Sequence, residues 1–145
     1  KAGYWHRDTQ YTGLSIEDQK KAMLEEPVIH CHIPFIDDEA FELIPGSHKR
    51  WDNELEFNTR MNLKDHKNSD SLDQAINYKC RRGDLRLFSA HAIHRGINYG
   101  PTPERFIFDA LFIIKSKSTK KYLNQKAMPE RAELRWIDNA EIYEI

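Results

Sequence analysis

The residues most suited to chemistry are histidines, and the most informative of the seven stands beside an aspartate near the start of the chain. His6 and Asp8 are two positions apart in the run Trp5-His6-Arg7-Asp8-Thr9. In an extended segment, residues i and i+2 project from the same face, so this imidazole and this carboxylate can reach one metal ion. A second histidine from elsewhere would complete a 2-His-1-carboxylate set, which is associated with non-haem Fe(II) and leaves coordination positions open.

A second region supplies a candidate for the missing histidine. Gly83-Asp84 leads through a predicted strand to His94, and Arg105 follows eleven residues later, at the start of the most apolar stretch. Arginine presents a rigid fork of donors that holds a carboxylate by two hydrogen bonds. An arginine that points into a protein is costly unless an anion pairs with it. A dicarboxylate that chelates the metal at one end and meets Arg105 at the other would satisfy both requirements.

At this point the sequence resembles the phytanoyl-CoA dioxygenase-like family of Fe(II)/2-oxoglutarate-dependent oxygenases. The resemblance covers roughly residues 5–114, and its most distinctive part is the run Leu43-Ile44-Pro45-Gly46-Ser47-His48-Lys49. The HxD pair precedes this run, and residues 83–96 and Arg105 follow it in the family's order and spacing. By this resemblance the catalytic residues that hold the iron are His6, Asp8 and His94, and Arg105 binds the distal carboxylate of the cosubstrate 2-oxoglutarate.

The same resemblance implies a fold and an activity. The fold is mainly β, a double-stranded β-helix (a jelly roll, or cupin-like barrel) with short peripheral helices and the metal at one mouth. The activity is oxidation by O2 of a small organic substrate, most simply hydroxylation, while 2-oxoglutarate is converted to succinate and CO2. We expect residues 1–145 to form one such domain, without the N-terminal segment that family members carry before the HxD pair. The chain also departs from many relatives at Gly96, where they place a hydroxyl residue.

Two other functions remain open. A non-catalytic or degenerate jelly-roll domain would bind a partner or ligand without oxygenase chemistry. A cupin-type metalloenzyme would use His30 and His32, which share one face of a predicted strand, together with His94. The acid and glycine positions that follow fit the cupin pattern poorly, so we expect packing roles for His30 and His32. His91 faces away from His94 in an extended strand, and we assign the metal-ligand role to His94.

Predicted strands surround these residues. Strand patterns, either alternating or rich in β-branched and aromatic residues, occur at residues 28–36, 74–80, 85–88 and 105–114. Pro34 indicates an edge strand or a strand end, and the very apolar residues 105–114 predict a central strand. Several short strands with turn residues such as Pro45-Gly46-Ser47 favour a sandwich or a barrel.

Helices are expected at the periphery. Ser15 and Asp18 match a capping box ahead of residues 19–25, which predicts a short helix there. Residues 58–74 are polar and charged, which predicts a surface loop. There is no internal repeat and no sign of a second domain.

Composition sets the remaining bounds. With 22 basic and 23 acidic residues in 145, the formal net charge is -1, which argues against a nucleic-acid binder that works by bulk electrostatics. No run approaches the roughly 18 apolar residues of a membrane span. Cys31 and Cys80 form no framework or CxxC motif, which favours a reducing, cytoplasmic setting. The expected partner is therefore a small-molecule substrate, not nucleic acid or membrane, and the oligomeric state is left open.

Overall fold

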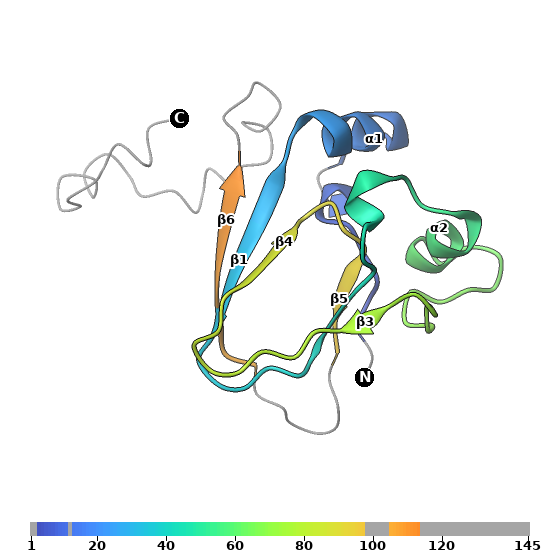
Figure 1. Ribbon diagram of the computed structural model, residues 1–145. Helices are drawn as coiled ribbons and strands as arrows, with labels where there is room; N and C mark the ends of the chain where they lie inside the picture. Colours follow the sequence, from blue (N-terminus) through green and yellow to red (C-terminus); the bar gives the residue numbers. More distant parts are fainter. Residues whose placement is uncertain (1–2, 12, 98–104, 114–145) are drawn as a thin grey trace.

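The computed structural model describes residues 3–11, 13–97 and 105–113, and within them the chain forms mainly β structure (Figure 1). The elements in chain order are the 3-10 helix η1 (Asp8–Tyr11), α1 (Ile16–Glu25), β1 (Val28–Pro34), β2 (Phe41–Leu43), the 3-10 helix η2 (Ser47–Lys49), α2 (Glu54–Arg60), β3 (Ile76–Asn77), β4 (Arg86–Ser89), β5 (His94–Gly96) and β6 (Ile107–Ile113). The expectation of a mainly β chain with short helices is confirmed.

The strands form two antiparallel sheets, with the orders β4-β1-β6 and β3-β2-β5. The segment before η1 extends the second sheet, because His6 forms an isolated antiparallel bridge with His94 of β5. In Figure 1 the two sheets lie on opposite sides of the molecule's interior. Their inner faces meet through aromatic rings, since the centroids of Phe41 on β2 and Phe88 on β4 are 4.7 Å apart.

The central strand of the first sheet is β1, not the very apolar β6. Hydrogen bonding on both sides of β1 pairs Cys31 with Leu87 of β4 and with Ala110 of β6. Pro34 is the last residue of β1, which fits a strand end, because proline cannot donate a hydrogen bond to the ladder. The prediction of a central strand at 105–114 is therefore wrong for the described residues, in which β6 stands at the end of the strand order.

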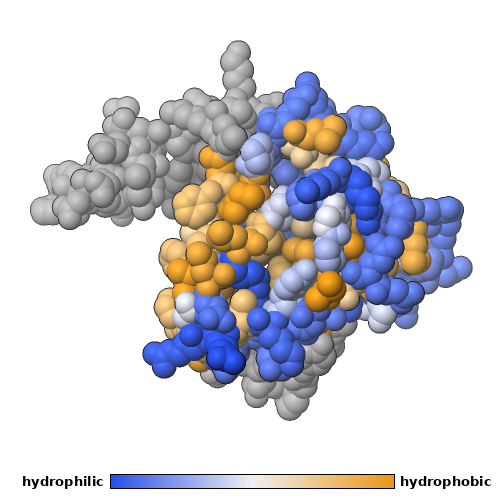
Figure 2. All heavy atoms as spheres, viewed as in Figure 1, coloured by the Kyte–Doolittle hydropathy of each residue, from blue (hydrophilic) through white to orange (hydrophobic). Residues whose placement is uncertain are grey.

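The outer face of this sheet is apolar and exposed. Because side chains alternate along a strand, His30 and His32 face the interior, and Ile29 and Ile33 point outward beside residues of β6. Phe108 and Phe112 of β6 are 51% and 60% exposed. Figure 2 shows this hydrophobic surface in orange over the strands of the β4-β1-β6 sheet.

The second sheet carries the main buried cluster, which consists of Trp5, Ile44, Leu72 and Ile93. Trp5 is fully buried, and its indole Nε1 donates to the backbone carbonyl of Asp70 at 2.8 Å. The guanidinium of Arg95 covers the same indole at 4.3 Å from the ring centroid. This packing holds the chain immediately before His6.

The helices agree only in part with expectation. Ser15 caps α1 by accepting a hydrogen bond from the backbone of Asp18, so the predicted helix is confirmed. Residues 58–60, predicted as surface loop, instead end α2, and Thr59 is buried. A capping box between Asn53 and Glu56 starts this helix. Two of its buried polar residues have charged partners, since Glu56 pairs with Arg50 and Arg60 pairs with Asp52.

The predicted strand at 74–80 is shorter than expected. Only Ile76–Asn77 joins the ladder, although Cys80 forms an isolated bridge with Asp38. Cys31 and Cys80 are both free thiols. No helix among the described residues has the length and apolar character needed to cross a membrane.

Candidate metal centre

The structure brings His6, Asp8 and His94 together, and one donor atom from each lies within 4.8 Å of the others. Asp8 Oδ1 is 3.5 Å from Nε2 of His6 and 3.6 Å from Nε2 of His94. The two histidines meet because they are paired across the sheet: His6 N–H donates to the His94 carbonyl at 3.1 Å, and His94 N–H donates back at 3.0 Å. Directly paired residues carry neighbouring side chains, and these ring centroids are 4.3 Å apart.

In its neutral form, each of the two rings presents an unprotonated nitrogen to Asp8. His6 Nδ1 donates to the Tyr4 carbonyl at 2.7 Å, and His94 Nδ1 donates to the Ala92 carbonyl at 2.9 Å. Because a carbonyl oxygen only accepts, each neutral ring carries its proton on Nδ1 and a lone pair on Nε2. Separations of 3.5 and 3.6 Å from Asp8 Oδ1 are too long for hydrogen bonds.

The two separations from Asp8 are compatible with a shared divalent cation. Two donors bound to one ion at about 2.1 Å can be at most about 4.2 Å apart, and both separations from Asp8 Oδ1 are shorter than that. Two imidazoles and one carboxylate suit iron and its neighbours among the divalent transition metals. The backbone carbonyls that fix the Nδ1 protons are the usual outer partners of metal-binding histidines.

The charge states of the cluster also suit a cation. Burial, reinforced by the neighbouring His6, lowers the pKa of His94 to about 4, so its ring is neutral at physiological pH. Burial by itself would raise the pKa of Asp8, but the hydrogen bond from His30 and the nearby His94 bring that pKa below its ordinary value. Asp8 is therefore an ionised acceptor.

Arg7, between the two N-terminal donors, anchors this segment. Its side chain is fully buried, and its Nε and Nη2 donate to Asp52 Oδ1 at 2.9 and 2.7 Å. Nη1 donates to the carbonyls of Ser47 and His91. Because successive side chains of the extended segment point to opposite sides, Arg7 is held on one side while His6 and Asp8 face the other.

The Pro45-Gly46-Ser47 turn forms a hydrogen bond to the segment that leads into His94. Gly46 has φ 74°, a left-handed conformation that glycine adopts without strain. The turn brings the fully buried Ser47 hydroxyl to the Ile44 carbonyl, to which it donates at 2.7 Å, and to the Ile93 N–H, from which it accepts at 2.8 Å. Ile93 directly precedes His94, so this distinctive motif supports the site without contributing a donor to it.

His30 and His32 join a neighbouring group and do not form the cupin-type set with His94. Their partner is Asp109 of β6, whose Oδ1 is 2.8 Å from His30 Nδ1 and 3.4 Å from His32 Nε2. His30 Nε2 also donates to Asp8 Oδ2 at 2.6 Å. Burial would lower the pKa of His30, but the bonds to Asp8 and Asp109 outweigh it and raise that pKa.

Sequence reasoning missed the role of Asp109. It is the one charged residue in the strand sequence IFDALFI, and a carboxylate in an apolar strand is a signal of a partner on the inner face. The structure groups His94, not His91, with His6 and Asp8. His91 is buried elsewhere and donates from Nε2 to the Glu26 carbonyl at 2.7 Å.

Arg105 lies outside the donor cluster and already has a carboxylate partner. Its Nε and Nη2 donate to the two oxygens of Asp38 at 3.1 and 3.2 Å, and Arg86 donates to Asp38 Oδ2 at 2.8 Å. Burial would raise the pKa of Asp38, but these two guanidiniums lower it. The sequence analysis did not identify Asp38, because nothing local in the chain links it to an arginine 67 positions away.

Gly96 leaves room for Arg105. A Cβ at Gly96 would lie 2.7 Å from Arg105 Nη1, closer than van der Waals contact permits. The guanidinium of Arg105 thus packs against Gly96. Among the described residues, none accepts a hydrogen bond from Nη1.

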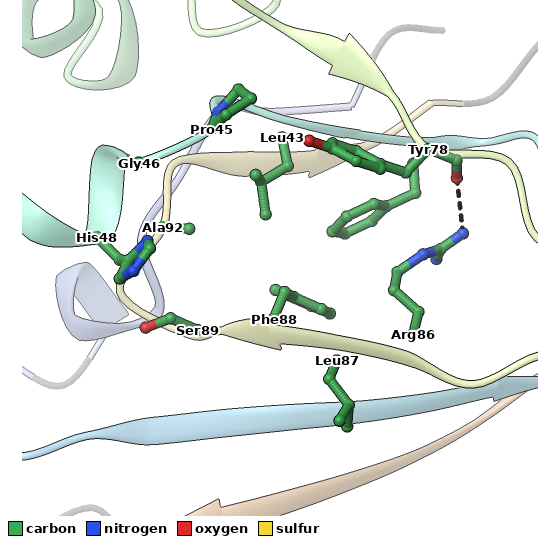
Figure 3. A pocket seen from close by; sticks show the side chains of 11 residues that line it. Leu43, Pro45, Gly46, His48, Tyr78, Arg86, Leu87, Phe88, Ser89 and Ala92 are labelled. Carbon is green, nitrogen blue, oxygen red and sulfur yellow. Dashed lines mark hydrogen bonds between the residues drawn. The ribbon is translucent and has the colours of Figure 1, made fainter.

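A cavity of about 290 Å³ is lined by residues of β2, β4 and the turn before η2, and none of the three candidate donors lines it (Figure 3). In Figure 3, His48 and Ala92 are at one end and Tyr78 and Arg86 at the other. Phe41 and Phe88 line the cavity and also approach the ring of His94, with centroids 5.8 and 5.1 Å away. The lining is mostly apolar, which is typical of a small-molecule site.

No protein-family model and no curated protein matches this chain.

Proposed function

We propose that this protein is an Fe(II)- and 2-oxoglutarate-dependent oxygenase of the phytanoyl-CoA dioxygenase-like kind, which hydroxylates a small organic substrate and releases succinate and CO2. The observation that carries this proposal is the convergence of His6 Nε2, His94 Nε2 and Asp8 Oδ1, with both Nδ1 protons turned away to backbone carbonyls. Three protein donors on one side of an ion leave the remaining positions for a chelating cosubstrate and O2.

The topology supports a jelly roll as the scaffold. From His6 onward the chain passes to β1 in the other sheet, returns to β2 and β3, crosses to β4, returns to β5 and crosses again to β6. Such alternation between two facing antiparallel sheets is the pattern of a jelly roll. The donors come from the paired segments at His6 and β5.

In this proposal each residue has a distinct task. His6 and His94 hold the ion through Nε2, and Asp8 supplies the one anionic ligand. A bound Fe(II) would supply the redox chemistry that activates O2, while 2-oxoglutarate and the substrate would provide the electrons that reduce it. Arg105 receives the distal carboxylate of 2-oxoglutarate: Arg86, Arg105 and Asp38 together carry one net positive charge, and Nη1 of Arg105 has no acceptor among the described residues.

The pairing of Arg105 with Asp38 favours a second candidate, a non-catalytic jelly-roll binding domain. If Asp38 satisfies Arg105 permanently, the cosubstrate loses its anchor and the fold remains as a scaffold. The two candidates differ in whether 2-oxoglutarate is turned over.

The test is succinate formation by the full chain supplied with Fe(II), 2-oxoglutarate and O2, a reaction that needs no prime substrate for slow turnover. We expect succinate from the wild type and from His66→Ala, a change at a half-exposed histidine in the loop after α2. We expect none from His6→Ala or Asp8→Ala. An iron-loaded wild type that forms no succinate above the level of His6→Ala would refute the oxygenase and favour the binding domain.

A further inference from the structure

His30 occupies an unusual place between two carboxylates. Its Nε2 is 2.6 Å from Asp8 Oδ2, and its Nδ1 is 2.8 Å from Asp109 Oδ1. A carboxylate oxygen only accepts, so His30 donates at both nitrogens when the two acids are ionised. Neither nitrogen then has a lone pair with which to bind a metal.

We infer that His30 is a positioning residue for Asp8: it holds Oδ2 so that the carboxylate offers Oδ1 alone to the metal, and Asp109 holds His30 in place from behind. This inference rests on the metal centre of the proposed function and adds to it a residue outside the ligand set. Ligating carboxylates are commonly oriented by such hydrogen bonds, which set the ligand's geometry and basicity.

The surroundings of His30 fit this role. The side chain is 12% exposed, and its ring stacks on Phe88 with centroids 4.8 Å apart and planes inclined by 11°. Packing therefore fixes the ring plane, and the two hydrogen bonds fix its rotation. A ring held in this way can orient Asp8 without reorganising when a metal enters.

His32 lies on the same face of β1 as His30 but makes no hydrogen bond to Asp8. It lies two residues further along the same inner face of β1 and is 3.4 Å from Asp109 Oδ1, beyond hydrogen-bond length. Its Nδ1 is buried without a hydrogen-bond partner among the described residues, and its Nε2 faces Asp109, so it has no bond to Asp8. His32 is therefore a matched control on the same strand face.

The experiment is a Co(II) titration of the full chain without 2-oxoglutarate, followed by visible absorption. His30→Phe keeps a flat ring for stacking on Phe88 and removes both hydrogen bonds. We expect it to weaken Co(II) binding about 10–100-fold, the usual effect of losing an outer partner of a metal ligand. The Co(II) spectrum should also change, because the freed Asp8 Oδ2 becomes available as a second ligand atom. His30→Gln, whose amide can donate to Asp8, should recover part of the affinity.

The control outcomes separate this inference from its premise. His32→Phe should bind Co(II) as the wild type does, and thermal unfolding should show both phenylalanine variants folded at the titration temperature. The inference fails if His30→Phe keeps wild-type affinity and spectrum, or if His32→Phe is equally weakened. It also fails if the wild type binds two ions and His32→Phe loses one, because His30 would then be a ligand. A wild type that binds no Co(II) overturns the proposed function itself.

Discussion

The buried ion network around Arg7 allows a quantitative test of how the HxD segment is held. Asp52 receives Arg7 at one oxygen and Arg60 at the other, and the side chains of Asp52 and Arg7 are fully buried. Asp52→Asn keeps the size of the side chain but removes the charge and replaces one acceptor with a donor. Two buried guanidiniums then share a single neutral oxygen.

The expected loss of stability is large. Breaking a buried ion pair by neutralising one partner typically costs about 3–5 kcal/mol, because the remaining charge is left uncompensated. That is a substantial part of the roughly 5–15 kcal/mol by which a domain is stable. For a chain of this size it lowers the thermal midpoint by about 10–15 °C. Since Arg7 lies between His6 and Asp8, Co(II) affinity should also fall at temperatures where the variant is still folded.

The assay is thermal unfolding followed by circular dichroism, with the Co(II) titration repeated well below the midpoint. Glu54→Gln serves as the control, because it removes an acidic charge from the exposed pair with Lys64 and should leave the midpoint unchanged. A midpoint for Asp52→Asn equal to that of Glu54→Gln would refute the network as the anchor of the HxD segment. Normal Co(II) affinity in a strongly destabilised variant would show that the network supports the fold but not the ligands.

Three further predictions follow from the same contacts. Arg105→Ala should raise the 2-oxoglutarate concentration needed for half-maximal succinate formation about 10–100-fold, the effect of losing a charge-assisted bond of about 1.5–3 kcal/mol; saturation like the wild type's would contradict its role. Ser47→Ala leaves the Ile93 N–H without its acceptor and should cost about 1–3 kcal/mol in urea unfolding, whereas an unchanged midpoint would mean that water replaces the hydroxyl. Asp38, whose pKa is below its ordinary 3.8, contributes stability that is full above that pH and is lost as the pH falls below it. Asp38→Asn should therefore flatten the acid limb of the stability curve, and a limb as steep as the wild type's would count against this assignment.

The elements that follow local patterns were predictable. Alternation and β-branching indicated strands at β1 and β4, and the serine cap indicated α1. The helix α2 was missed because its polar residues resemble a surface loop. Thr59 is nevertheless buried, and Arg60 finds Asp52 in the interior, a partner that no local pattern reveals. The place of β6 at the end of the strand order, among the described residues, was missed for a similar reason, since apolar composition does not specify which strands lie beside it.

The candidate site also contains some features that local sequence predicts and others that only the tertiary structure determines. His6 and Asp8 face one way because neighbouring side chains of an extended segment alternate, and Gly46 permits the turn that carries Ser47; both follow from backbone geometry over a few residues. The cross-strand pairing of His6 with His94, the capture of Arg105 by Asp38 and the bond from His30 to Asp8 depend on strand register and on how the sheets pack. A local period determines which way a side chain points, but only the folded chain determines what it meets there. The sequence was therefore sufficient to propose the histidine and aspartate side chains as metal donors. The residues that orient these side chains and balance their charge could be identified only in the tertiary structure.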